Sequence, residues 1–188
     1  MAQPLPSPTP SRGLPFSVMD VERDRLYVTP LGEPDPDEIQ SFWARSQPVL
    51  GAVQPGPVPS AWCFGDTVEL ANELIELVVS GTKRATVGAM AEYEADGDPL
   101  PTPGDLSIVM DGSTRPRALL ETTEVRVGPL SSVDEQFAWD EGEGDRTRQW
   151  WLDAHAWYFT RAFARLGIEF HPDITVVFER FVVRCHES

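Results

Sequence analysis

Helical and extended patterns of apolar residues alternate along most of this chain. Asp35, followed by a proline and then by Glu38, predicts a short helix that begins at residue 35. Asp66, with Glu69 three residues later, predicts the N-terminal cap of a second helix, and Gly81 is placed to end it. Two further helices are predicted over residues 133–139 and from about 147 to 166.

Extended segments are predicted between these helices. The strand candidates are residues 62–64, 84–91, 105–110, 117–127 and 174–183. The sequence Asp111-Gly112-Ser113 marks a turn between two of them. Because the strands form local hairpins and the helices flank them rather than alternate with them, we predict an α+β fold with an antiparallel or mixed sheet.

The N-terminal segment differs from the rest of the chain. Residues 1–34 are rich in proline and only weakly periodic, so they cannot bury enough apolar surface to offset the entropy lost on ordering. We therefore expect a flexible tail over residues 1–34 and one compact domain over residues 35–188. One alternative function follows from the tail, which could recruit a protein partner in an extended conformation.

Composition and charge narrow the classes of protein. The formal net charge of −15 opposes non-specific binding of nucleic acid, so any RNA contact must be local or the ligand small. The two cysteines have no metal-ligand spacing and predict neither a disulfide framework nor a zinc site, and we expect no metal and no cofactor. Because no stretch suits a membrane helix and the N-terminus lacks a secretory pattern, we expect a cytoplasmic protein without membrane contact.

Lys83 is the only lysine among the 15 basic residues of the chain. A partly desolvated lysine can lose its proton and act as a base, whereas arginine cannot do so near neutral pH. Thr86 follows three residues later, and a bend between them would bring its hydroxyl near the amine, as in nucleophilic catalysis. The alternatives are a solvated lysine on a turn and an ordinary β-branched strand residue.

An acidic loop at residues 140–146 is the second candidate feature. It combines four carboxylates with two glycines, so its backbone can approach a ligand closely. A carboxyl group of this loop, with Glu141 favoured, could act as a general acid; the alternative is a solvated acidic turn before the next helix. Trp62 and Tyr93 lie beside these polar segments and are candidates for stacking on a base. His155 lies in the long helix, where a structural role is expected.

Four short segments together resemble the ASCH family, whose hallmark is G-x-K-x-x-T. They are residues 62–66, 81–86, 104–105 and 141–142, and they occur in the family's order and spacing. The resemblance covers roughly residues 42–183 and is strongest for longer bacterial members with an EGEGDR loop before an aromatic helix. It implies a PUA-like fold: a small, mostly antiparallel β-barrel with flanking helices and a cleft proposed to bind RNA or nucleosides.

The resemblance also implies roles for three residues. Small bacterial amidohydrolases of this family deacetylate N4-acetylcytidine with a lysine base, a threonine nucleophile and a glutamate proton donor. The motif match assigns these roles to Lys83, Thr86 and Glu141, with Glu143 as the fallback for the glutamate. Gly88 stands where those enzymes have an arginine.

Two functions are therefore expected as alternatives. One is an amidohydrolase that acts on N4-acylated cytidine-type nucleosides. The other is an RNA-binding module or ribonuclease-like protein without that activity, so the expected ligand is a nucleoside or single-stranded RNA. The expected ligand contacts are Trp62, Arg84, Tyr93, Glu143 and Arg146.

Overall fold

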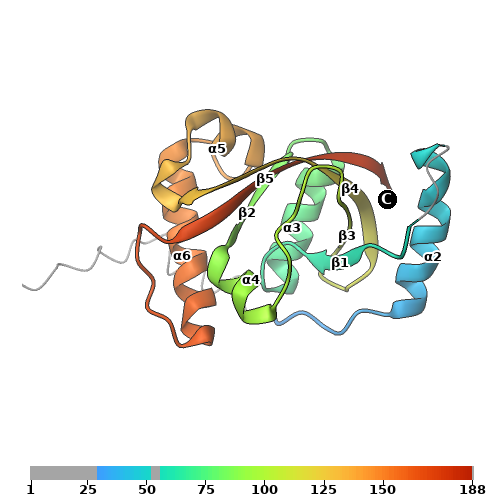
Figure 1. The fold of residues 1–188 in the computed structure, drawn as a ribbon, viewed down its shortest axis with the longest axis horizontal. Coiled ribbons are helices and arrows are strands. Elements are labelled where there is room, and N and C mark those ends of the chain that lie inside the picture. Colours follow the sequence, from blue (N-terminus) through green and yellow to red (C-terminus); the bar gives the residue numbers. More distant parts are fainter. Residues whose placement is uncertain (1–28, 52–55, 188) are drawn as a thin grey trace, which may run out of the picture.

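The fold is a five-stranded mixed sheet that curls into a half-barrel, with helices packed around it (Figure 1). It is seen in a computed structural model that describes residues 29–51 and 56–187. The strands are β1 Ser60–Cys63, β2 Ala85–Ala89, β3 Leu106–Met110, β4 Pro116–Pro129 and β5 Thr175–His186. The α-helices are α2 Pro36–Ser46, α3 Val68–Val79, α4 Met90–Asp96, α5 Glu135–Glu141 and α6 Arg148–Leu166, and two short 3-10 helices cover Gln47–Leu50 and Leu130–Ser132.

The strands are ordered β1-β3-β4-β5-β2 across the sheet. Only the pairing of β1 with β3 is parallel, and the other three neighbouring pairs are antiparallel. This arrangement confirms the predicted α+β class with a mixed, mostly antiparallel sheet. Most of the predicted N-terminal tail, residues 1–28, lies outside the described residues.

Both faces of the sheet centre are covered, which explains why β3 and β4 are apolar on both sides. Alternate side chains point to opposite faces: Ile108 and Leu119 pack under α2, whereas Val109 and Leu120 pack under α3. In Figure 1, α2 and α6 lie at opposite ends of the molecule, with the sheet and α3 between them. A separate cluster joins α5 and α6 to β2 and β5, so the core divides into three packed groups.

Local capping signals set most helix starts. Asp35 accepts a hydrogen bond from the amide of Asp37, and Thr147 accepts one from the amide of Trp150, so the predicted starts of α2 and α6 are confirmed. The predicted cap of α3 was wrong by one residue, because Thr67 accepts from the amide of Leu70. Asp66 is instead drawn into ion pairs with arginines of α6.

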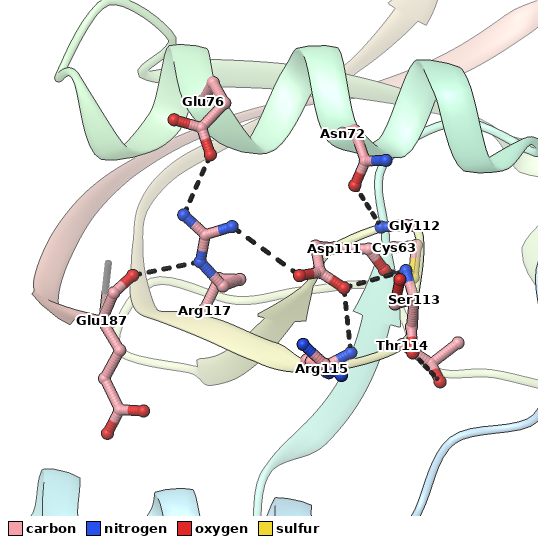
Figure 2. Close-up of polar contacts among 10 residues, drawn as sticks. All are labelled: Cys63, Asn72, Glu76, Asp111, Gly112, Ser113, Thr114, Arg115, Arg117 and Glu187. Carbon is pink, nitrogen blue, oxygen red and sulfur yellow. Dashed lines mark hydrogen bonds and ion pairs between the residues drawn. The ribbon is translucent and has the colours of Figure 1, made fainter.

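The turn between β3 and β4 is fixed by polar contacts with α3 (Figure 2). Asn72 of α3 accepts a hydrogen bond from the amide of Gly112, and the Asp111 carboxylate accepts from the amide of Ser113. A Cβ on Gly112 would lie 2.3 Å from the carbonyl oxygen of Val68, so only glycine allows this approach. The predicted turn is confirmed.

One helix was not predicted from the sequence. The strand expected over residues 84–91 ends at Ala89, and α4 begins at Met90 after an N-cap alanine, which has no side-chain acceptor. Gly97, with a φ of 73°, ends this helix after two turns. None of the helices in the described part of the chain is long and apolar enough to cross a membrane.

Candidate functional site

Lys83 lies where the chain leaves α3 and enters β2. Gly81 has a φ of 74°, and the amides of Thr82 and Lys83 both donate to the carbonyl of Leu77. This tight turn directs the side chain of Lys83 into the molecule, where only 1% of the residue is exposed. The alternative of a solvated turn lysine is therefore wrong.

Two carboxylates hold the Lys83 ammonium group. Its Nζ atom donates to Oε2 of Glu141 and to Oε1 of Glu143, each at 2.6 Å. Glu141 is itself only 1% exposed, at the end of α5. A cation this deeply buried requires such partners, because an unpaired one would lose its proton or destabilise the fold.

Gly142 allows the two glutamates to reach the lysine. Its φ of 74° suits glycine, and a Cβ there would lie 2.7 Å from the carbonyl oxygen of Thr82. The amide of Arg84 also donates to the carbonyl of Asp140 at 2.7 Å. The segment before β2 and the end of α5 are therefore in direct backbone contact.

The three ionisable groups would carry a net negative charge if all were ionised. Burial raises the pKa of Glu141 to about 8, with Lys83 opposing the shift and Glu143 adding to it. Burial would also raise the pKa of Glu143, but Lys83 and His155 outweigh it and lower this pKa. For Lys83, burial is outweighed by the two carboxylates, which raise the pKa. At neutral pH the cluster therefore holds an ammonium, one carboxylate and one protonated carboxyl.

This cluster faces a small inner cavity of about 80 Å³. Polar side chains from three elements line it together with apolar ones: Phe64, Leu70, Leu74, Lys83, Thr86, Glu141, Glu143, Ala154, His155, Trp157 and Tyr158. A larger groove of about 570 Å³ adjoins it and shares Phe64, Thr86 and Tyr158 as walls. A ligand in the groove could therefore place one small group against the cluster.

Thr86 lies at the junction of the inner cavity and the groove. It is the second residue of β2 and pairs in the sheet with Glu179 of β5. Within the described part of the chain, no hydrogen bond joins its hydroxyl to Lys83. The structure thus brings Lys83, Thr86 and Glu141 to one cavity, with the threonine on its outer side.

The two aromatic residues expected to contact a ligand both line the groove. Trp62 of β1 packs edge-on against Phe64, with 4.6 Å between ring centroids. Tyr93 lies on α4 and covers Gly88, where a Cβ would come within 3.0 Å of its ring. Burial, with a smaller contribution from Glu179, raises the pKa of Tyr93 to about 12, so its hydroxyl stays protonated.

The two arginines expected at the site lie elsewhere. Arg84 neighbours Lys83 in sequence but points outward, where its guanidinium donates to Asp140 at 2.8 Å. Arg146, with a φ of 62°, places its guanidinium 4.9 Å from the ring centroid of Trp139. Neither side chain lines the inner cavity or the groove.

Two groups in this region were not assigned to the site from the sequence. His155 of α6 donates from Nδ1 to the carbonyl of Trp151, and its Nε2 lies 3.8 Å from Oε1 of Glu141. Glu179 of β5 is 9% exposed in the groove and accepts from the hydroxyl of Thr122 at 2.6 Å. Helical and strand spacing mark both as inward-facing, but the spacing alone does not show which cavity they reach.

Metal binding has no candidate in the part of the chain that the structure describes, where no three His, Cys, Asp or Glu side chains are grouped to hold an ion. The carboxylates of the inner cavity are occupied by Lys83 instead. The chemistry available there is proton transfer and nucleophilic attack by a hydroxyl.

The curled mixed sheet defines a PUA-like fold, and the inner cavity around Lys83 gives it an enclosed polar site at the junction of α3 and β2. The profile of the ASCH domain matches residues 60–184, and the chain belongs to the ASCH domain family. The match contains all five strands up to residue 184, together with the lysine cluster.

Two solved structures share this fold along most of their length. An ASCH domain from Lactobacillus crispatus JV V101 is 30% identical, with a TM-score of 0.73 over 86% of this chain and 100% of that one. A protein from Enterococcus faecalis V583 is 33% identical, with a TM-score of 0.71 over 78% of this chain and 88% of that one. A comparison with curated proteins gives no significant match.

Proposed function

We propose that this cleft hydrolyses an acyl group from the amine of a nucleobase, in a substrate of the N4-acylated cytidine type. The observation that carries the proposal is that Lys83, Thr86 and the buried Glu141 line one small cavity, with Glu141 hydrogen-bonded to the lysine at 2.6 Å. A carboxyl whose pKa is about 8 is a proton donor at neutral pH, which a leaving amine requires.

The proposed reaction proceeds in two steps. The Thr86 hydroxyl attacks the acyl carbon, its proton passes to Lys83, and one ammonium proton shifts to the Glu143 carboxylate. Glu141 gives its proton to the nitrogen as the C–N bond breaks, which leaves an acyl ester on Thr86. Water then hydrolyses the ester, releases the carboxylic acid and restores the three groups.

The role of Lys83 differs in one respect from that of a simple base. Because the two carboxylates raise its pKa, the amine is an ammonium group at neutral pH and cannot accept a proton by itself. Glu143 solves this problem, since it is ionised and lies 2.6 Å from the same nitrogen. We therefore give Glu143 the role of proton acceptor behind Lys83, rather than that of a direct ligand contact.

The surroundings of the cavity favour this function over RNA binding. Among the residues that the structure describes, several carboxylates and no lysine or arginine line the groove beside it, so it would repel a phosphate backbone. Arg84 is held in an ion pair with Asp140, and Arg146 lies on Trp139. The membership of the ASCH family supports a nucleobase as the group that is recognised.

The test measures release of cytidine from N4-acetylcytidine by the full chain. Replacing Thr86→Val removes the hydroxyl at nearly constant volume and should abolish turnover, whereas Thr86→Ser should retain part of it. Glu141→Gln should lower kcat by about 100- to 10,000-fold, the range for loss of a general acid. Thr82→Val, in the same segment but outside the cavity lining, is the matched control and should leave the rate unchanged. Absence of turnover by the unaltered protein, or full activity of Thr86→Val, would contradict the proposal.

A further inference from the structure

The groove outside the inner cavity is strongly acidic. Five carboxylate side chains line it, contributed by α4, the segment after it and β5: Glu92, Asp96, Asp98, Asp105 and Glu179. No lysine, arginine or histidine is among its lining residues in the described part of the chain. The groove is therefore a concave surface whose formal charges are all negative.

These carboxylates have no ion-pair partner among the described residues, and only Glu92 is partly offset by a more distant cation, Arg165. Where the structure is described, none of the five carboxylates forms an ion pair, and their hydrogen-bond donors are neutral. Some acids elsewhere do have such partners: Asp66 pairs with two arginines of α6, and Asp140 pairs with Arg84 and Arg180. None of the lysine and arginine residues in residues 29–51 and 56–187 lines the groove.

Burial makes this arrangement costly for the free protein. Burial raises the pKa of Glu92, and Asp96 adds to the shift; burial likewise raises the pKa of Glu179, and Asp105 adds to it. A carboxylate in this position gains more from a nearby positive charge than one in open solvent, because the local dielectric constant is lower. The groove is thus prepared for a ligand that brings that charge.

The aromatic walls suit the same kind of ligand. Trp62, Phe64, Tyr93 and Tyr158 line the groove between the carboxylates. Ring faces attract organic cations and stack on heterocycles, whereas they offer nothing to a phosphate. Carboxylates combined with aromatic faces therefore recognise a cationic or donor-rich heterocyclic compound.

An independent feature indicates that a ligand completes this cleft. Oε1 of Glu141, in the adjoining inner cavity, is buried and has no hydrogen-bond partner among the described residues. A buried carboxyl oxygen left in this way costs about 1–3 kcal/mol, and a hydrogen-bonding group on a bound molecule would remove that cost. The ligand would thus span the groove and the inner cavity together.

Resting on the proposed function, we propose that the substrate is unphosphorylated and carries a positive charge on the part that lies in the groove. The acyl amide enters the inner cavity, and the cationic end lies among the groove carboxylates. A phosphate at that end would face five acids that have no ion-pair partner among the described residues, and it would be excluded.

The test compares three probes that share one base and differ in charge: 5′-amino-5′-deoxycytidine, cytidine and cytidine 5′-monophosphate. Their affinities for the full chain are measured by calorimetry at about 50 mM and 500 mM salt. We expect the amine to bind most tightly and the monophosphate most weakly. Their dissociation constants should differ at least tenfold at low salt, and by less at high salt. A monophosphate that binds as well as the amine, or an amine that does not bind, would overturn the proposal.

Two variants locate the effect in the groove. Glu179→Gln keeps an oxygen for Thr122, and the pair Asp96→Asn with Asp98→Asn removes charge at the mouth. Each change should weaken the binding of the amine roughly fivefold and leave the binding of cytidine nearly unchanged. Glu38→Gln on α2 removes the same charge outside the groove and should change neither affinity. If the groove variants weaken the binding of cytidine as much as that of the amine, charge is not the cause and the inference fails.

Binding and turnover separate the two proposals. Charge-ordered binding without hydrolysis of N4-acetylcytidine would remove the proposed reaction and leave the inference on ligand charge intact. Hydrolysis without any preference for the amine over the monophosphate would remove the inference on ligand charge and leave the proposed reaction intact.

Discussion

The ammonium group of Lys83 shares a nearly closed space with two carboxyl groups of unequal character. Glu141 is almost completely buried, whereas the Glu143 side chain keeps 13% of its surface exposed. The more buried carboxyl therefore takes up the proton, and the less buried one stays ionised as the partner of the lysine. This division leaves the cluster electrically neutral and provides a proton donor at the same time.

Removing the lysine charge should be the most damaging change at this site. Lys83→Met keeps the length of the side chain but leaves Glu143 buried without a cation, so we expect a loss of about 3–5 kcal/mol in the free energy of unfolding at pH 7. Adding Glu143→Gln removes the unpaired charge and should restore most of the loss. Denaturant unfolding of the single and double variants measures both effects. A double variant no more stable than Lys83→Met would show that packing, rather than charge, causes the loss.

The raised pKa of Glu141 predicts how stability and rate depend on pH. Between its ordinary pKa of 4.5 and its folded value of about 8, the folded state binds a proton that the unfolded state has released. The stabilisation is therefore complete below about pH 4.5 and is lost as the pH rises towards 8, by at most about 1.4 kcal/mol per pH unit. Glu141→Gln should lack this decline when the two proteins are unfolded from pH 5 to 9.

The same proton should control turnover. The rate of N4-acetylcytidine hydrolysis should fall above pH 8, where Glu141 loses its proton. Glu143→Gln makes Glu141 the sole counterion of Lys83, so the pKa of Glu141 should fall and the alkaline decline should move to lower pH. An alkaline limb that stays in place in this variant would argue against Glu141 as the titrating acid.

At the scale of elements, the site depends on how closely the end of α5 approaches the segment before β2. Gly142→Ala should destabilise the protein for two reasons: an unfavourable positive φ and a clash with the backbone of Thr82. Gly97→Ala is the matched control, because Gly97 has a similar φ of 73° and open space around its Cβ position. We expect the free energy of unfolding to fall by about 1 kcal/mol in the control and by about 2–4 kcal/mol in Gly142→Ala, measured by thermal or denaturant unfolding. Equal losses would mean that the contact with Thr82 yields easily.

The elements that the sequence predicts well are those with local signals. Asp35, Thr147 and Gly167 act on residues within one turn of them, so the ends of α2 and α6 could be read from the chain. Asp66 was misassigned because its partners, Arg161 and Arg165, are almost a hundred residues away. Helix α4 was missed because its N-cap residue is Ala89, which has no side-chain acceptor to mark the start of a helix.

The same distinction applies to the site. The G-x-K-x-x-T motif and the acidic loop were sufficient to predict that Lys83, Thr86 and Glu141 meet at one cavity. Arg84 was expected to contact a ligand, but its side chain pairs with Asp140 on the outer side of this segment, which the motif does not show. Glu179 belongs to a strand that joins the groove only through sheet pairing, which no local pattern shows.

At the scale of the whole molecule, positive and negative side chains occupy different places. Arginines are concentrated in ion pairs and over aromatic rings, including Arg161 over Trp157 and Arg126 over Phe178. Every charged side chain that lines the groove in the described part of the chain is acidic, and the formal net charge of the chain is −15. Both the local and the overall field therefore oppose an approaching polyanion.

Single-stranded RNA should consequently bind poorly. At about 150 mM salt we expect no saturable binding of a 12-nucleotide single strand in fluorescence anisotropy, and no protection of Trp62 from quenching. Neutralising phosphates releases counterions, so a protein that used RNA as its ligand would bind tightly at low salt and lose affinity steeply as salt rises. For this protein the same titration should show little affinity at low salt as well as at high salt, because the groove carboxylates repel phosphates where a binding site would need cations. Tight binding of the strand with a steep dependence on salt would assign the cleft to RNA after all.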